Sequence, residues 1–129
     1  MAIEKQFSVF VQNKVGSLGE LCTLFAKEQI NIKAISIIDD LEWGIVKLVV
    51  DNPDKARDAL HSLGLMYGES QVLTVEVGNR PGALADLASR LASKKINIEQ
   101  AFATASGDGS LLILSTTDDK KANSLLEAR

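Results

Sequence analysis

The sequence has few of the side chains that build covalent, metal or acid–base chemistry. Among its 129 residues there is one cysteine, Cys22, so no disulfide can form within the chain and no cysteine-rich metal cage can be built. There is also one histidine, His61, which excludes a histidine metal pair or a histidine-based catalytic triad within one chain. Since no set of nucleophile, base and orienting group is visible, we predict a protein that is not an enzyme and has no cofactor.

Aromatic residues and positive charge are also scarce. Aromatic side chains make up 5% of the chain, so few side chains can stack on nucleic-acid bases. The net charge is −3, so the chain as a whole does not attract phosphate groups. No apolar run approaches the ~20 residues that span a bilayer, and the N-terminus lacks the apolar core of a signal peptide. We therefore expect a cytoplasmic protein that binds neither nucleic acid nor membrane.

What the sequence does contain is an internal repeat. Residues 7–63 align with residues 73–129 at a constant offset of 66 and without a gap. The match is densest from residue 9 to residue 32, where ten of 24 aligned pairs are identical. Chance would give roughly one or two such pairs. The sequence therefore predicts one small unit used twice, with domains at 1–70 and 71–129.

The hydrophobic pattern gives the fold class. Alternating or continuous apolar residues predict strands, and apolar residues three and four apart predict helices. The strands are expected at about 7–11, 30–38, 44–50, 65–70, 72–77, 97–104 and 111–116. A first helix, which Ser17 could help cap, is expected around the stripe Leu18, Leu21, Cys22 and Phe25, and a third around Leu84, Leu87, Ala88 and Leu91. A second helix is expected to start at Asn52-Pro53-Asp54 and end at Gly64, and a fourth to start at about residue 120. This is an α+β chain of two tandem ferredoxin-like βαββαβ units, with antiparallel sheets and helices on one face. The second unit lacks its last strand, which leaves one side of residues 72–77 to be covered by the first unit, by a second chain or by a rearranged terminus.

One repeated segment joins the first strand of each unit to its first helix. A helix that starts directly after a strand has backbone N–H groups without partners, and its partial positive charge suits a carboxylate. Glycine allows close approach, and proline at a helix start costs no hydrogen bond. The alternative is that these residues only shape a tight turn. The segments are Asn79-Arg80-Pro81-Gly82-Ala83-Leu84 and Asn13-Lys14-Val15-Gly16-Ser17-Leu18.

A second repeated segment follows each of these helices. It is Ile30-Asn31-Ile32 in the first unit and Ile96-Asn97-Ile98 in the second. The asparagine amide can donate to a carboxylate and accept from an ammonium group. Alternatively, the asparagine only caps the preceding helix in a left-handed turn. Because both segments recur at the same offset, we favour a paired binding site.

These two segments, in a βαββαβ unit, resemble the ACT domain, a small regulatory module that binds amino acids. The resemblance covers essentially the whole chain as two tandem copies. It implies a site between ACT units, in which backbone amides at a helix start grip the ligand. The first copy has Val15 where the family usually has proline, which argues against equal occupancy of the two sites. The residues so nominated are Asn13, Val15, Gly16, Ser17, Leu18, Asn31, Asn79, Pro81, Gly82, Ala83, Leu84 and Asn97.

The resemblance implies a non-catalytic sensor of a free amino acid. We expect a homodimer with ACT units side by side, because a second chain would cover the unpaired strand and supply the sites between units. A metabolic enzyme or regulator is the further partner to expect. The alternative is a ligand-free regulatory or assembly subunit that binds a protein through the same faces. Trp43 could line a site, although a surface aromatic that stiffens the hairpin is the favoured interpretation.

Overall fold

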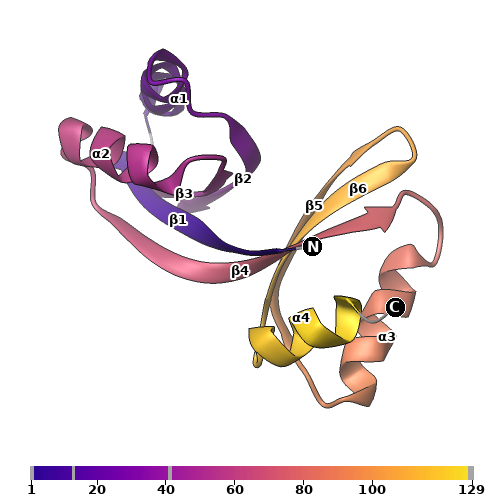
Figure 1. The fold of residues 1–129 in the computed structure, drawn as a ribbon. Helices are drawn as coiled ribbons and strands as arrows, with labels where there is room; N and C mark the ends of the chain where they lie inside the picture. Colours follow the sequence, from indigo (N-terminus) through magenta and orange to yellow (C-terminus); the bar gives the residue numbers. More distant parts are fainter. Residues whose placement is uncertain (1, 13, 41, 128–129) are drawn as a thin grey trace. The chain divides into compact units, whose positions relative to one another are not determined.

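The computed structural model describes residues 2–12, 14–40 and 42–127. These residues form six strands and four helices, in an order that confirms the predicted α+β class and the repeated βαββα pattern (Figure 1). The elements are β1 (Ala2–Gln12), α1 (Ser17–Lys27), β2 (Ile32–Asp40), β3 (Trp43–Val50), α2 (Pro53–Leu63), β4 (Tyr67–Gly78), α3 (Ala83–Ser93), β5 (Ile98–Ser106), β6 (Gly109–Thr116) and α4 (Asp119–Glu127).

The chain folds into two compact units. Lys5–Ser70 forms the N-terminal unit, and the chain from Gln71 onward forms the C-terminal unit together with the start of β1, up to Glu4. The predicted domains are 1–70 and 71–129. The structure differs from this only in that the first residues of β1, up to Glu4, belong to the C-terminal unit. Since β1 has 11 residues and β4 has 12, each strand is long enough to contribute to both units.

The start of β1 supplies the strand that the C-terminal unit was expected to lack. In the N-terminal unit the strand order is β2-β3-β1-β4, and in the C-terminal unit it is β1-β4-β6-β5. The hydroxyl of Thr74 also donates to the carboxylate of Glu4 at 2.5 Å. Of the three covers considered for residues 72–77, the structure therefore provides one from the start of the chain itself, which lies beside β4 near Thr74.

Strand pairing follows the same repeat as the sequence. Phe7 lies opposite Leu48 in β1 and β3, and 66 residues later Leu73 lies opposite Leu114 in β4 and β6. The register of β2 on β3 shifts after Ile32, and that of β5 on β6 shifts after Ile98, again 66 residues later. The repeat therefore extends to the backbone geometry of the two sheets.

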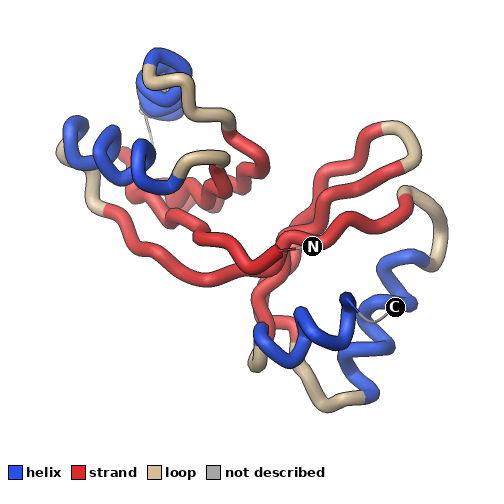
Figure 2. The backbone as a smooth tube through the Cα atoms, in the orientation of Figure 1, coloured by secondary structure: helices blue, strands red, loops and turns tan. Residues whose placement is uncertain are grey.

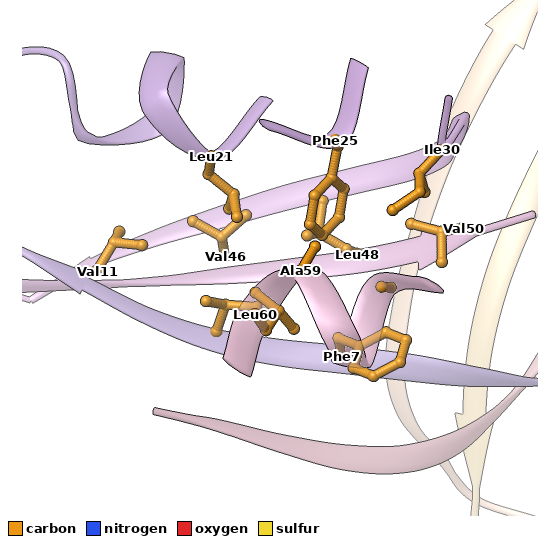
Figure 3. Close-up of a cluster of buried hydrophobic side chains, with 12 residues drawn as sticks. Phe7, Val11, Leu21, Phe25, Ile30, Val46, Leu48, Val50, Ala59 and Leu60 are labelled. Carbon is orange, nitrogen blue, oxygen red and sulfur yellow. The ribbon is translucent and has the colours of Figure 1, made fainter. Parts of the chain in front are cut away.

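The core of the N-terminal unit lies between its sheet and the pair α1 and α2, which pack against each other. Figure 3 shows Leu21 and Phe25 reaching from α1 toward Val46 and Leu48 of β3. The stripe predicted for α1 is thus confirmed at these two positions, whereas Leu18 and Cys22 are half-buried. In Figure 2 the two helices lie on one side of the strands.

The core of the C-terminal unit is built in the same way. Leu87 and Leu91 of α3 pack with residues of β4, β6 and α4. The stripe predicted for α3 is wrong at Leu84, whose side chain is 53% exposed, while Ala83 is buried in its place. The buried side of the helix therefore begins one residue earlier than the apolar spacing predicts.

Side chains cap α2 and tie it to β4. Asn52 accepts a hydrogen bond from the amide of Lys55 at 3.2 Å, and Gly64 ends the helix at φ 66°, as the sequence predicts. Arg57 donates twice to Glu69 of β4, at 2.8 and 2.9 Å, and contacts Asp54 at 2.6 Å. Its guanidinium lowers the pKa of the Glu69 carboxyl below its usual range, chiefly through these hydrogen bonds.

We predict that Leu87→Ala destabilises the protein by about 2–5 kcal/mol, because Leu87 is only 1% exposed and its loss leaves a cavity. Leu84→Ala, in the same helix, should cost less than about 1 kcal/mol, since that side chain is already largely in water. Urea denaturation of both variants measures the difference. Equal losses for the two variants would contradict the observed orientation of α3.

Candidate functional site

The first helix of each unit begins at a glycine with a left-handed backbone. Gly16 precedes α1 at φ 92° and Gly82 precedes α3 at φ 91°. Other residues rarely adopt this conformation, so glycine is the residue that this turn favours. Figure 2 shows the loop that leads from β4 into α3. Because glycine has no side chain, neither helix has a side-chain cap, and Ser17, predicted to help cap α1, is instead its first residue.

These helix starts differ from those of α2 and α4. In α2 and α4, Asn52 and Asp118 accept hydrogen bonds from the amides of Lys55 and Lys121. In α1, the amides of Leu18 and Gly19 have no acceptor among the described residues, and the same is true of Leu84 and Ala85 in α3. The first helix of each unit thus starts without a side-chain cap and has amides free to bind an anion.

The loops themselves are closed by equivalent bonds. The amide of Ser17 donates to the carbonyl of Lys14, and the amide of Ala83 donates to the carbonyl of Arg80, both at 3.3 Å. Asn79 is fixed by the turn before β6, because its Nδ2 donates to the carbonyl of Gly107 at 2.9 Å. This nominated residue therefore positions the loop. Its counterpart Asn13 lies outside the described residues.

The other nominated loop residues surround the helix starts. Val15 and Pro81 are exposed at the loop tips, Leu18 is half-buried and Ala83 is buried. The two loops thus offer backbone amides and one small hydroxyl, Ser17, rather than charged groups from the nominated set.

Asn31 and Asn97 lie at the opposite end of the same helices. Their backbone amides donate to the side chains of Asp51 and Thr117, at 3.0 and 3.1 Å. An α-helix of 11 residues is about 16 Å long, so within one unit neither asparagine reaches a ligand at the helix start. The alternative role as a left-handed helix cap is also wrong, since Gln29 and Lys95 adopt that conformation, at φ 59° and 61°.

An open hollow of about 620 Å³ lies beside the start of α1, a size usual for small-molecule sites. Lys14, Ser17 and Glu20 line it from the loop and the first turn of α1. The rest of its lining comes from the end of β1, the start of β3 and the segment between α2 and β4, and includes Phe10, Val11, Gln12, Trp43, Gly64, Leu65 and Met66.

A second hollow, of about 660 Å³, lies at the corresponding place beside α3. Six of the lining positions are equivalent at the offset of 66. In the order of the chain, the pairs are Phe10 and Glu76, Val11 and Val77, Gln12 and Gly78, Lys14 and Arg80, Ser17 and Ala83, and Glu20 and Asp86. The two hollows therefore occupy equivalent places at the starts of α1 and α3.

A basic and an acidic residue recur in both hollows. Arg80 and Asp86 form an ion pair at 3.6 Å, whereas Lys14 and Glu20 form none among the described residues. The sequence reasoning missed this pair, although charge of the same sign at the same offset was a usable signal. It also predicted Leu65 and Met66 only as the start of a strand, because nothing in the local sequence indicates that they line the hollow.

The described residues offer little for other chemistry. They bring together no group of three or more histidine, cysteine, aspartate and glutamate side chains that could bind a metal ion. Among the described helices, none combines the length and apolar composition needed to cross a membrane.

Comparison with solved structures supports the fold. Protein BT0572 from Bacteroides thetaiotaomicron is 30% identical, with a TM-score of 0.91 over 98% of this chain and 88% of that one. The ligand-free regulatory subunit of aspartate kinase from Thermus thermophilus is 16% identical, with a TM-score of 0.72 over 98% and 89%. The same subunit from Thermus flavus is 17% identical, with a TM-score of 0.68 over 98% and 89%.

The sequence comparison gives the family. A search of curated proteins finds no match. Residues 1–128, however, match the family model described as the ACT domain pair, which confirms the resemblance seen in the two repeated segments. The chain belongs to the family of ACT domain pairs.

Proposed function

We propose that this chain is a non-catalytic regulatory protein that binds a free amino acid at the start of α1, with a related site at the start of α3. The observation that carries the proposal is the recurrence of one hollow at both helix starts, each with a cation and a carboxylate. A free amino acid has the complementary pair of charges, an α-carboxylate and an α-ammonium group.

The groups around α1 suit this ligand. The free amides of Leu18 and Gly19, the positive end of the helix and the ammonium group of Lys14 favour a carboxylate. Glu20 lines the same hollow and can accept from the ligand's ammonium group. Few contacts are available to so small a ligand, so we expect a dissociation constant on the order of micromolar to millimolar.

The fold is in keeping with a regulatory role. Two of the similar structures are regulatory subunits of an enzyme, aspartate kinase. By this analogy of fold, the partner that responds to the ligand is a metabolic enzyme or another regulator.

A homodimer would complete the sites. Asn31 and Asn97 lie at the far ends of α1 and α3, so within their own units they do not reach the ligand. A second copy placed side by side could bring an asparagine to the open side of a hollow. The apolar side chains Ile35, Ile37 and Ile38 on β2, the edge strand of the N-terminal unit, favour such packing because they are exposed.

We predict that dialysis against a mixture of the protein amino acids retains at least one of them, and that Lys14→Gln weakens its binding about tenfold or more. The loss follows from removing a charged donor to the carboxylate. Lys27→Gln is the matched control, because Lys27 lies in the last turn of α1 and should leave affinity unchanged. Calorimetric titration measures both variants, and equal affinities would argue against a carboxylate at the start of α1.

We predict a dimer in sedimentation velocity at micromolar concentration, and a monomer for Ile37→Lys, whose side chain is 52% exposed in the single chain. Burying an unpaired charge in an interface is unfavourable. Leu63→Lys, at an exposed position of α2, should leave the dimer intact. A wild-type monomer, with and without amino acids, would refute the dimer.

The two measurements together separate the proposal from its alternative. A dimer that retains no amino acid would instead support a ligand-free assembly subunit, which binds a protein partner through the same exposed strand.

A further inference from the structure

The two hollows have six equivalent lining positions, but they differ in some of the residue types at these positions and in the other residues that line them. Phe10 in the N-terminal unit corresponds to Glu76 in the C-terminal unit, and Trp43 corresponds to Gly109. Leu65 and Met66 also line the hollow beside α1, whereas Leu87, Ser89 and Arg90 complete the lining beside α3. The first hollow thus has more large apolar side chains in its lining than the second.

Backbone hydrogen bonding places these apolar side chains together. The amide of Phe10 donates to the carbonyl of Met66 at 2.9 Å, which fixes the segment before β4 against β1. Trp43 begins β3 opposite Gln12, the last residue of β1. Trp43 and Met66 are 49% and 75% exposed, so a ligand that covered them would remove apolar surface from water. The lining comes from three separate segments that meet beside α1.

The charged residues of the two hollows differ in whether they are already paired with each other. In the C-terminal unit, Arg80 and Asp86 already contact each other at 3.6 Å, and the hollow is further lined by Glu76 and Arg90. An incoming zwitterion must compete with that ion pair. In the N-terminal unit, Lys14 and Glu20 are about as far apart in sequence but form no ion pair among the described residues. The hollow beside α1 therefore combines unpaired charges for the ligand's backbone groups with an apolar lining for its side chain.

We infer that the hollow beside α1 selects amino acids with a large apolar side chain, aromatic or long aliphatic, and that Trp43 is a specificity-determining residue. The inference rests on the proposed function, because it assumes that an amino acid binds there with its carboxylate toward the helix start. The hollow beside α3 does not share this selectivity, since Glu76 takes the place of Phe10 there and Arg90 also lines it. One large apolar amino acid binds per chain.

Trp43 makes the test direct, because it is the single tryptophan of the chain. Titration with phenylalanine, leucine or methionine should change its fluorescence, and calorimetry should show one site per chain. These ligands should bind at least roughly tenfold more tightly than alanine or serine, since a few buried methylene groups give discrimination of that order. Trp43→Ala should remove most of this preference, while Trp43→Phe should retain it. Because Trp43 is about half exposed, circular dichroism is expected to show both variants folded.

The outcomes separate the inference from the function on which it rests. If small or charged amino acids bind as tightly as large apolar ones, or if Trp43→Ala keeps the preference, the inference is overturned while amino-acid binding stands. If no amino acid binds at all, both fail. If a Trp43 variant loses its far-ultraviolet circular dichroism signal, Met66→Ser takes its place. Met66→Ser should also lose the preference for large apolar amino acids, and an unchanged preference would overturn the inference.

Discussion

The structure depends on making two four-stranded sheets from six strands. Each unit has a sheet of four strands beneath its two helices. Each copy of the repeat contains only three strands, β1 to β3 in the first and β4 to β6 in the second, so the fourth strand of each sheet must be shared. The long strands β1 and β4 solve this, because each has neighbours on both sides and contributes to both units. Without the start of β1, the C-terminal unit would leave the backbone of β4 near Thr74 without a neighbour on one side.

The same constraint positions the candidate sites. The loops before α1 and α3 follow directly from β1 and β4, the strands that are paired on both sides. A site at the end of a central strand is held more firmly than one at a sheet edge, which favours a preorganised arrangement of amides. Glycine at the turn then leaves those amides without a side-chain cap. The uncapped starts of α1 and α3 thus follow the two strands that have neighbours on both sides.

Because the chain contains the same unit twice, the features of its two hollows can be compared position by position. The left-handed glycine, the strand register and the basic and acidic pair are the same in both units, while the surrounding lining is not. On the proposed function, the features that both units share would contact the backbone groups of an amino acid, which are common to all such ligands. The features that differ, such as Trp43 against Gly109, would contact the ligand's side chain. The two units therefore need not bind the same molecule.

Much of this fold could be predicted because it depends on local patterns. The repeat, the order of elements and the ends of α2 at Asn52 and Gly64 follow from short-range spacing and turn chemistry. The strand that completes the C-terminal unit could not be predicted, since its pairing joins the start of the chain to residues near position 74. Likewise, Leu65 and Met66 line the hollow only because of tertiary contacts. The length of α1 also separates Asn31 from the loop at residues 13–16, although the sequence nominated both for one ligand site.

The central claim is that an amino acid binds with its carboxylate at the start of α1. The most direct test is a two-dimensional amide NMR titration of the full chain with the amino acid that dialysis retains. The account predicts that the amide signals of Leu18 and Gly19 shift most, together with the indole signal of Trp43, while those at the capped start of α2 near Lys55 stay in place. Shifts confined to other surfaces, or none around α1 at saturating ligand, would contradict it.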